Sequence, residues 1–212
     1  MNTLDQTGIE KDLHGSGYDL VAGVDEAGRG PLAGPVVAAA VILPRGVFLP
    51  GVTDSKKLSR STRERLIQGI RDSALSIGVG IVDHETIDRI NILQASLLAM
   101  KQAVHNGTSV PEYILVDGTF TLDLSIPQQA IPKGDARCLS ISAASIVAKV
   151  TRDRLMGKFH RRFPGYRFDK HKGYGTKEHL ERIRQLGPCE IHRKTFKGVK
   201  ELVLSQDPLG NH

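Results

Sequence analysis

Apolar residues along this chain gather in short runs that predict β-strands. The runs occupy residues 20–25, 35–43, 74–82, 113–116 and 129–132. The second run is continuously apolar, which is typical of a strand buried on both faces, and Pro44 ends it. The fifth run ends at Pro132, which places it near the edge of a sheet, where a missing backbone donor is tolerated.

Between these runs, apolar residues recur with helical period. The predicted helices cover residues 60–73, 85–106, 142–162, 176–186 and 195–204. Ser59 and Thr176 are suited to cap the first and fourth helices, and Gly187 with Pro188 ends the fourth. Small residues at 142–145 permit close packing of the third helix. Strands followed by alternating strands and helices predict an α/β domain with a mixed sheet.

The length of 212 residues suits one domain. We expect residues 1–17 to form a polar lead-in and residues 18–212 a single domain that includes C-terminal helices at about 176–205. No apolar run is long enough to span a bilayer, and the N-terminus lacks the apolar core of a secretory signal. We therefore expect a cytoplasmic protein with no membrane partner. Cys138 and Cys189 lack CxxC spacing and are expected to be reduced thiols.

The distribution of charge favours a polyanionic partner. The formal net charge of +6 is weak evidence by itself. Basic residues concentrate between residues 149 and 200, where aromatic residues such as Phe159, Tyr166 and Tyr174 are interleaved with them. These basic residues are Lys149, Arg152, Arg154, Lys158, Arg161, Arg162, Arg167, Lys170 and Lys172. Such a segment is suited to following a phosphate backbone while rings pack on sugars or bases.

Acidic residues follow three of the predicted strands. Asp25 ends the first strand, Asp117 ends the fourth and Asp135 follows the fifth. Strand ends of this kind can converge on one edge of a sheet, where open α/β folds place ligands. Glu26 can join Asp25 only if the strand ends or bulges there, because neighbouring strand residues face opposite sides. Clustered carboxylates repel one another unless a cation lies between them, so the pattern predicts a site for hard divalent cations.

Other interpretations of these residues remain open. Any single acid is more often a surface charge, and Asp135 is well placed to cap the helix that follows it. Asp153 competes for the fourth acidic position, but we favour an ion pair with Lys149, Arg152 or Arg154. His171, His179 and His192 lie on separate elements without metal-ligand spacing, which disfavours zinc, and the Cys189–His192 pair has no second pair to complete a site. No Ser-His-Asp or Cys-His pattern suggests a covalent nucleophile.

Two glycine-rich segments are candidates for contacts with the partner. Gly28-Arg29-Gly30 exposes backbone N–H groups that can approach phosphate or sugar, because glycine has no Cβ. A tight turn is the simpler interpretation, and the spacing does not fit a dinucleotide-binding loop. Tyr174 lies between two glycines, where an exposed loop is expected. Its simpler interpretation is a loop anchor.

Several blocks in the same order resemble the type 2 ribonucleases H, specifically the bacterial ribonuclease HII family. They are residues 25–37 (DEAGRGPLAGPVV), 54–58 (DSKKL), 116–118 (VDG), 133–136 (KGDA), 141–153 (ISAASIVAKVTRD), 171–176 (HKGYGT) and 192–193 (HR). They span nearly the whole chain, and their number and order make the resemblance specific. Gly175 stands where this family often has a proline.

The resemblance implies a ribonuclease H-like fold, with a five-stranded sheet flanked by helices and a helical C-terminal region. It implies an endoribonuclease that hydrolyses the RNA strand of RNA–DNA hybrids. Such an enzyme also nicks duplex DNA 5′ of embedded ribonucleotides, leaving 3′-OH and 5′-phosphate ends, and so serves ribonucleotide removal. A monomer is expected.

The resemblance also implies roles for individual residues. Asp25, Glu26, Asp117 and Asp135 align with acids that bind two Mg²⁺ or Mn²⁺ ions, which can activate water and stabilise a leaving oxygen. The loop of Gly28, Arg29 and Gly30 is expected to sense a ribose 2′-OH, and Tyr174 to pack on the next deoxyribose. The candidate phosphate contacts are Lys56, Lys57, Lys172 and Arg193.

Two other functions were weighed against this one. A junction resolvase or related nuclease on a similar fold would leave the Gly-Arg-Gly and Lys-Gly-Tyr blocks without a purpose. A hybrid-binding protein without catalysis would gain from losing negative charge near phosphate, yet all four acids are present.

Overall fold

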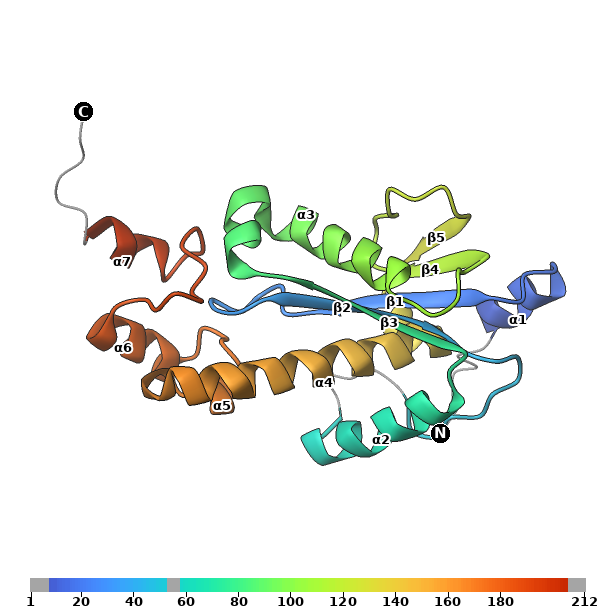
Figure 1. The fold of residues 1–212 in the computed structure, drawn as a ribbon, viewed down its shortest axis with the longest axis horizontal. Coiled ribbons are helices and arrows are strands. Elements are labelled where there is room, and N and C mark those ends of the chain that lie inside the picture. The colour runs from blue at the N-terminus through green and yellow to red at the C-terminus, as the bar shows by residue number, and fades with distance from the viewer. Residues whose placement is uncertain (1–7, 53–57, 206–212) are drawn as a thin grey trace.

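The computed structural model describes residues 8–52 and 58–205, and a five-stranded sheet runs through its middle (Figure 1). The strands are β1 (Val21–Ala27), β2 (Val36–Ile42), β3 (Ser76–Val82), β4 (Tyr113–Asp117) and β5 (Gln128–Ile131). Their order is β3-β2-β1-β4-β5. β1 pairs antiparallel with β2 and parallel with β4. The predicted mixed α/β sheet is therefore confirmed, and the fifth strand lies at its edge.

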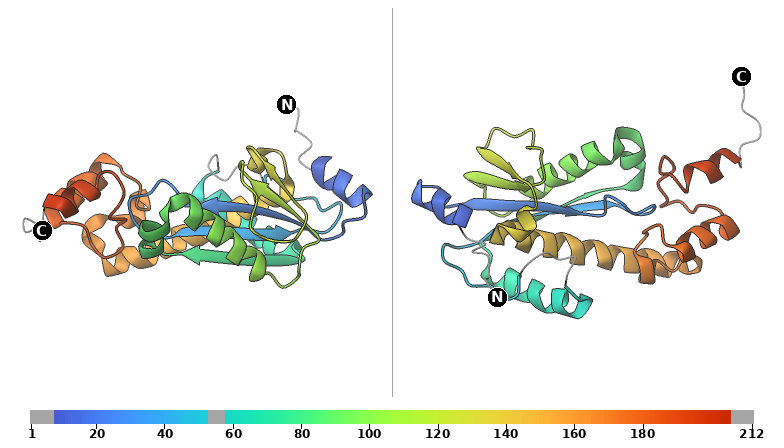
Figure 2. Two further views of the ribbon diagram at one scale, coloured as in Figure 1. Left: turned by 90° about the horizontal axis from the view of Figure 1, so that it is seen from above. Right: turned by 180° about the vertical axis from the view of Figure 1, so that it is seen from behind.

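Helices cover both faces of this sheet. They are α1 (Gly8–Gly15), α2 (Arg60–Ser73), α3 (His84–His105), α4 (Leu139–Arg162), α5 (Phe168–His171), α6 (Lys177–Leu186) and α7 (Lys200–Ser205), with 3-10 turns η2 (Gly134–Ala136) and η3 (Pro164–Tyr166). α3 lies on one face, and α4 with α2 beside it lies on the other (Figures 1 and 2). Because both faces are covered, every residue of β2 is buried. None of the helices in the described ranges has the length and apolar character needed to cross a membrane.

Helix α4 lies directly against β1. A Cβ added to Gly23 would fall 2.2 Å from the backbone nitrogen of Ile141, so only glycine permits this approach. The small residues at 142–145 are all buried, as the predicted close packing requires. The resulting contact fixes the N-terminal half of α4 against the strand that carries the first two acids.

Side chains cap the helices where the sequence predicts. Ser59 and Thr176 each accept a hydrogen bond from the backbone N–H three residues later, at 3.1 and 3.2 Å. α3 contains a kink that periodicity did not predict. Asn91 takes a left-handed conformation with φ 66°, and its Oδ1 accepts from the backbone N–H groups of Leu93 and Gln94. Asn91 therefore starts a second helical segment within α3.

The N-terminal segment contributes more than a polar lead-in, because residues 8–15 form α1. Its Glu10 is buried and accepts hydrogen bonds from the Ser140 N–H at 3.0 Å and the Ser140 Oγ at 2.9 Å. The N-cap residue of α4, Cys138, makes no side-chain capping bond. Glu10 thus caps α4 from a helix distant in sequence, and burial raises the pKa of its carboxyl.

The C-terminal helices pack around the end of α4, at the opposite end of the molecule from α1 (Figures 1 and 2). Phe168, Ile183 and Val199 form their core together with Leu32 from the segment after β1. The last helix begins at residue 200, not at 195 as predicted. The chain turns at Gly198, where φ is 94°, and a helix cannot continue through that conformation.

Candidate active site

Strand β1 carries Asp25 and Glu26 side by side. The strand does not end at Glu26, because β1 continues to Ala27 and Glu26 pairs in register with Ala38 of β2. The two carboxylates nevertheless lie close enough to interact with each other. Asp25 interacts with Ser145 on α4, whereas Glu26 lines a hollow beside α3.

Asp117, at the end of β4, brings the two carboxylates into one site. β4 lies parallel to β1 with Val24 opposite Val116, so Asp117 is beside Asp25 in the sheet. Its negative charge raises the pKa of both Asp25 and Glu26. Asp25, Glu26 and Asp117 therefore lie at neighbouring positions of β1 and β4, and their role as a metal site stays a prediction.

Asp135 lies in η2, immediately after β5, and is 7% exposed. It is not the N-cap of α4, because Cys138 occupies that position. The Oδ1 atom of Asp117 accepts a hydrogen bond from the Gly134 N–H at 2.7 Å, which ties η2 to the end of β4. Asp135 therefore belongs to the same sheet edge, and its carboxylate as a metal ligand stays a prediction.

The electrostatics of the acids favour a cation. Burial raises the pKa of Asp25 well above its usual range, and the charges of Glu26 and Asp117 raise it further. Burial also raises the pKa of Glu26, although Arg29, 3.3 Å from its Oε1, opposes the effect. A divalent ion relieves such repulsion, and a set of carboxylate oxygens alone suits hard cations such as Mg²⁺.

The carboxylates are not yet arranged as ligands. Within residues 8–52 and 58–205, no three His, Cys, Asp or Glu side chains are grouped closely enough to hold a metal ion. Two of the acids are occupied by other partners: Glu26 pairs with Arg29, and Asp117 accepts from Gly134. Each of these contacts uses one oxygen of its carboxylate, so both side chains keep lone pairs for a cation.

The loop after β1 has a shape that only its glycines allow. Gly28 has φ 104°, and a Cβ added to it would fall 2.1 Å from Nε of Arg152. Arg193 is fully buried and donates to the carbonyl oxygens of Gly28 at 2.6 Å, Arg29 at 2.9 Å and Gly34 at 2.9–3.0 Å. The prediction that Arg193 contacts phosphate is wrong, because its guanidinium is enclosed by the loop that it supports.

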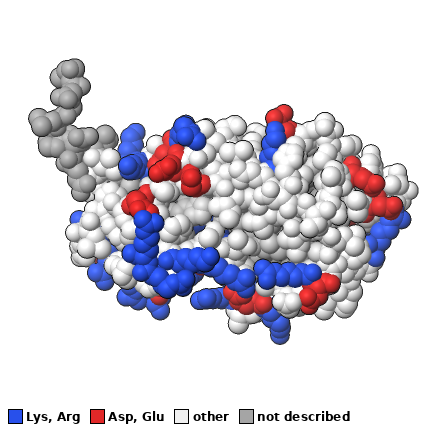
Figure 3. Space-filling view, viewed as in Figure 1, with Lys and Arg blue, Asp and Glu red and all other residues white. Residues whose placement is uncertain are grey.

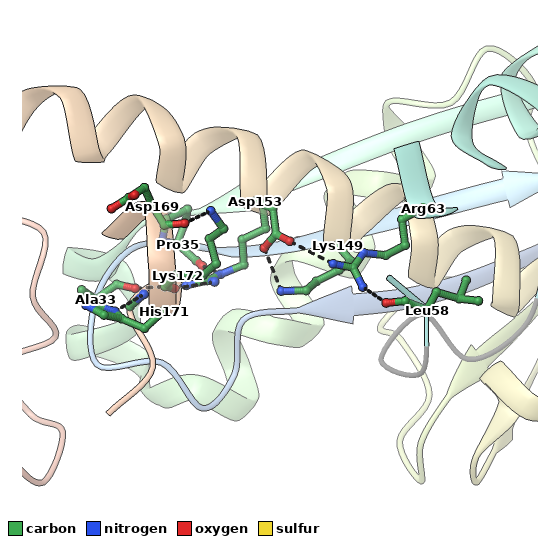
Figure 4. A network of polar contacts seen from close by, with 11 residues as sticks. Ala33, Pro35, Leu58, Arg63, Lys149, Asp153, Asp169, His171 and Lys172 are labelled. Carbon is green, nitrogen blue, oxygen red and sulfur yellow. Dashed lines mark hydrogen bonds and ion pairs between the residues drawn. The ribbon is translucent and has the colours of Figure 1, made fainter. Parts of the chain in front are cut away.

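Arg152 has a similar role, which sequence reasoning missed. It was placed in the basic segment expected to follow a phosphate backbone, but it is fully buried. It donates to the carbonyl oxygens of Ala33 at 3.0 Å, Pro35 at 2.9 Å and Lys172 at 2.9 Å, three residues that Figure 4 labels. Its position four residues after Ala148, on the apolar face of α4, was the available signal.

Tyr174 flanks the same loop. Its side chain is exposed, at 43%, and its Cε1 lies 3.8 Å from the position that a Cβ on Gly30 would take. The Nζ of Lys149 is 5.8 Å from the ring centroid. The structure thus places the exposed ring of Tyr174 beside the backbone of the Gly28–Gly30 loop.

Two further residues considered in the sequence, Asp153 and Lys172, make local contacts in the structure. Asp153 pairs with Lys149 at 2.7 Å and with Arg63 at 3.5 Å, which confirms the ion-pair interpretation (Figure 4). The half-buried Lys172 donates from Nζ to the Asp169 carbonyl oxygen at 2.7 Å, and its contact with phosphate stays a prediction. Residues 56 and 57 lie outside the described residues.

Lys and Arg side chains form a band along one edge of the molecule. Figure 3 shows this band over α4 and the helices at its C-terminal end, with fewer acidic side chains among them. The basic surface that the sequence indicated is therefore present, although Arg152 is buried and is not part of it.

Comparisons with known proteins agree on one family. The family model described as Ribonuclease HII matches residues 22–199. A ribonuclease HII of Geobacter metallireducens is 62% identical over 188 residues, which are 89% of this chain and 88% of that protein. The crystal structure of the ribonuclease H2 from Pyrococcus horikoshii OT3 has a TM-score of 0.73 at 28% identity, covering 89% of this chain and 99% of that one. Bst-RNase HIII in complex with Mn²⁺ has a TM-score of 0.68 at 21% identity, covering 91% and 71%, and supports the fold alone.

Proposed function

The chain belongs to the ribonuclease HII family and is an endoribonuclease, and from this premise we propose its substrates and the role of each site residue. It hydrolyses the RNA strand of RNA–DNA hybrids. It also nicks duplex DNA on the 5′ side of an embedded ribonucleotide, leaving 3′-OH and 5′-phosphate ends, so that ribonucleotides can be removed from DNA. The observation that carries this proposal is the position of the acids at one sheet edge beside a glycine loop and an exposed tyrosine ring.

The acids hold two divalent ions, Mg²⁺ or Mn²⁺. Asp25, Glu26 and Asp117 are mutually repelling carboxylates, and Asp135 is tied to them through the Gly134 N–H. The chemistry that such ions supply when bound is activation of water and stabilisation of a leaving oxygen. Bst-RNase HIII, which shares this fold, has been solved in complex with Mn²⁺. The ion pair with Arg29 involves Oε1 of Glu26 and leaves lone pairs on that carboxylate for a cation.

Selectivity for the RNA-to-DNA step comes from the loop and the ring. The Gly28–Gly30 backbone can approach a ribose 2′-OH because no side chain holds the sugar away. The ring of Tyr174, beside Gly30, packs on the next sugar and excludes an added hydroxyl. A metal cluster alone cannot distinguish the two sugars, so this contact is required for cleavage at a single ribonucleotide.

The basic band along α4 follows the duplex backbone, with Lys172 as one phosphate contact and Lys56 and Lys57 as further candidates. Affinity for duplex should therefore fall steeply as salt rises. The protein acts as a monomer in the cytoplasm, where the DNA of its bacterial relatives lies.

Cleavage of defined duplexes tests the proposal. End-labelled duplexes with one ribonucleotide, four ribonucleotides or none are incubated with Mg²⁺ or Mn²⁺. Asp117→Asn should bind duplex but lose most activity, while Asp72→Asn, a change at an exposed aspartate of α2, should cleave as wild type does. Equal rates for Asp117→Asn and wild type would refute the metal assignment.

The tyrosine is tested on the same duplexes. Tyr174→Ala should lower cleavage at a lone ribonucleotide about ten- to a hundredfold, since a lost stacking contact is worth roughly 1–3 kcal/mol. Duplex binding should weaken much less. Tyr174→Phe should lose less if packing is the main role. Unchanged cleavage by Tyr174→Ala would return the residue to a loop anchor.

A further inference from the structure

Three histidines that the proposed chemistry does not use lie stacked behind the tyrosine loop. They are His171 of α5, His179 of α6 and His192 of the segment after α6. The ring centroids of His171 and His179 are 4.3 Å apart, and those of His179 and His192 are 5.2 Å apart. All three side chains are buried, and the ring of Phe168 closes one side of the group.

Hydrogen bonds fix which nitrogen of each ring carries a proton. His179 Nδ1 lies 2.9 Å from the Tyr174 carbonyl oxygen and must donate to it. The Cys189 N–H lies 2.9 Å from His192 Nδ1, closer than the Cys189 carbonyl oxygen at 3.2 Å, so we assign Nδ1 as the acceptor of that N–H. The two Nε2 atoms are 3.1 Å apart, which leaves His192 as donor and His179 as acceptor. His171 fits the same logic, because its Nε2 donates to the Tyr166 carbonyl and its Nδ1 accepts from the Gly173 N–H.

The result is a directed chain with no place for an additional proton. A second proton on His179 would set two N–H groups against each other across 3.1 Å, and a second proton on His192 would face the Cys189 N–H at 2.9 Å. Burial accordingly lowers the pKa of His179 to about 3 and that of His192 to about 4. Each ring nitrogen of the three histidines has a hydrogen-bond partner, so none of these rings is free to bind zinc without breaking the chain.

One end of the chain holds the loop that carries the tyrosine. The Tyr174 carbonyl accepts both the His179 Nδ1–H and the Thr176 N–H, at 2.9 and 2.8 Å, so both its lone pairs are used. The Tyr174 N–H donates to the His171 carbonyl at 2.9 Å. The backbone of Tyr174 is therefore fixed at three points.

The other end of the chain reaches the glycine loop. His192 immediately precedes Arg193, whose guanidinium binds the carbonyl oxygens of Gly28 and Arg29. A backbone bridge joins His192 to Ala33, and the Arg193 N–H donates to the Leu32 carbonyl at 2.8 Å. The segment that ends at Arg193 is thus joined to the loop after β1 by backbone and side-chain hydrogen bonds.

We propose that His179 and His192 are positioning residues that set the distance between the Tyr174 ring and the Gly28–Gly30 backbone. The hydrogen bond between their Nε2 atoms joins the two segments that contact neighbouring sugars. This role rests on the proposed function, because the histidines affect selectivity only if the Tyr174 ring and the glycine loop recognise the RNA-to-DNA step.

Nitrogen-15 NMR of histidine-labelled protein tests the chain without activity. We expect a protonated Nε2 and an unprotonated Nδ1 for His192, the reverse for His179, and a scalar coupling between the two Nε2 atoms. The coupling should vanish in His179→Asn and in His192→Asn, which assigns it. If no such coupling is found in folded wild type, the proposed tie does not exist.

Matched substitutions test the consequence. Asn can place an amide donor where His179 Nδ1 lies, so His179→Asn keeps the bond to the Tyr174 carbonyl, whereas His179→Leu keeps bulk and loses both bonds. The measured quantity is kcat/KM on the one-ribonucleotide duplex divided by kcat/KM on the four-ribonucleotide duplex. His179→Leu should lower this ratio about ten- to a hundredfold, because small misplacements of positioning groups have effects of that size. His179→Asn lacks the hydrogen bond to His192, so it should recover only part of this loss. Full recovery would show that the tie to His192 is not needed.

Double variants separate positioning from stability. In a Tyr174→Ala background, His179→Leu should change the ratio no further, because it acts through the tyrosine. Equal losses on both duplexes that follow the folded fraction would show a structural role only and overturn the proposal, as would full additivity with Tyr174→Ala. If Tyr174→Ala itself leaves the ratio unchanged, the proposed role of the tyrosine fails; a ratio lowered by Tyr174→Ala but not by His179→Leu refutes the tie alone.

Discussion

Replacing Arg193 by lysine separates a loop anchor from a phosphate contact. Three guanidinium nitrogens of Arg193 donate to the carbonyl oxygens of Gly28, Arg29 and Gly34. Its guanidinium also lies 4.9 Å from the ring centroid of Phe196. Lysine keeps the positive charge but has one nitrogen, which cannot reach carbonyls arranged around a planar fork.

The expected loss follows from these contacts. If lysine retains one or two of the four hydrogen bonds, at least two charge-assisted bonds of about 1.5–3 kcal/mol each are lost in a buried site. We therefore expect Arg193→Lys to lower the free energy of unfolding by about 3–5 kcal/mol. This is a large part of the ~5–15 kcal/mol that stabilises a typical domain.

Urea unfolding followed by circular dichroism measures the loss. Arg162→Lys is the matched control, because Arg162 forms an exposed pair with Glu190 and its replacement should change stability by no more than about 0.5 kcal/mol. Duplex binding by Arg193→Gln is measured over a range of salt concentrations. If Arg193→Lys is as stable as wild type and Arg193→Gln lowers the salt slope by about one charge, the side chain contacts phosphate and the anchoring argument is refuted.

Three further changes test other parts of the structure. Gly23→Ala should lower the free energy of unfolding by at least about 3 kcal/mol, because its Cβ would lie 2.2 Å from the Ile141 nitrogen; chemical denaturation showing wild-type stability would contradict the close approach. The pKa values of buried His179 and His192 are lowered in the folded protein, so between about pH 4 and 6.5 the unfolded chain binds more protons. The free energy of unfolding therefore decreases as the pH is lowered through this range. His179→Asn should reduce the slope of this free energy against pH by up to about 1.4 kcal/mol per pH unit. Denaturation at several pH values measures this slope, and an unchanged one would mean that His179 titrates normally. Asp153→Asn should cost roughly 1–3 kcal/mol in stability and leave cleavage at saturating Mg²⁺ near wild type; loss of activity in a folded variant would make Asp153 part of the site.

The fold was predictable where local patterns decide it. Buried strands show as apolar runs, and Ser59 and Thr176 cap helices through interactions within four residues. The kink at Asn91 and the late start of α7 at Lys200 were missed, because single backbone conformations decide them and periodicity does not report these. The helix at residues 8–15 was missed because its stabilising partner, Ser140, is distant in sequence.

Some residues of the candidate site could likewise be predicted from local sequence, and others could not. The acids could be located because strand ends and the resemblance to a family both point to them. The role of Arg193 was predicted wrongly because the local sequence around an arginine does not show whether its side chain faces solvent or buried carbonyl oxygens. What decides its role is enclosure by residues 159 to 165 positions earlier in the chain. No spacing rule contains that information, although the burial of Arg152 could have been inferred from its face of α4.

The two buried arginines also fix when the glycine loop can form during synthesis. Residues 28–35 leave the ribosome early, but their carbonyl oxygens are bound by Arg152, 117 and 119 positions later, and by Arg193, 159 to 165 positions later. Until both arginines have been made, the first strand can carry its acids while the loop beside them has no fixed shape. We therefore expect a nascent chain that ends before residue 193 to be unable to select a ribonucleotide, so that selectivity is acquired only near the completion of the domain.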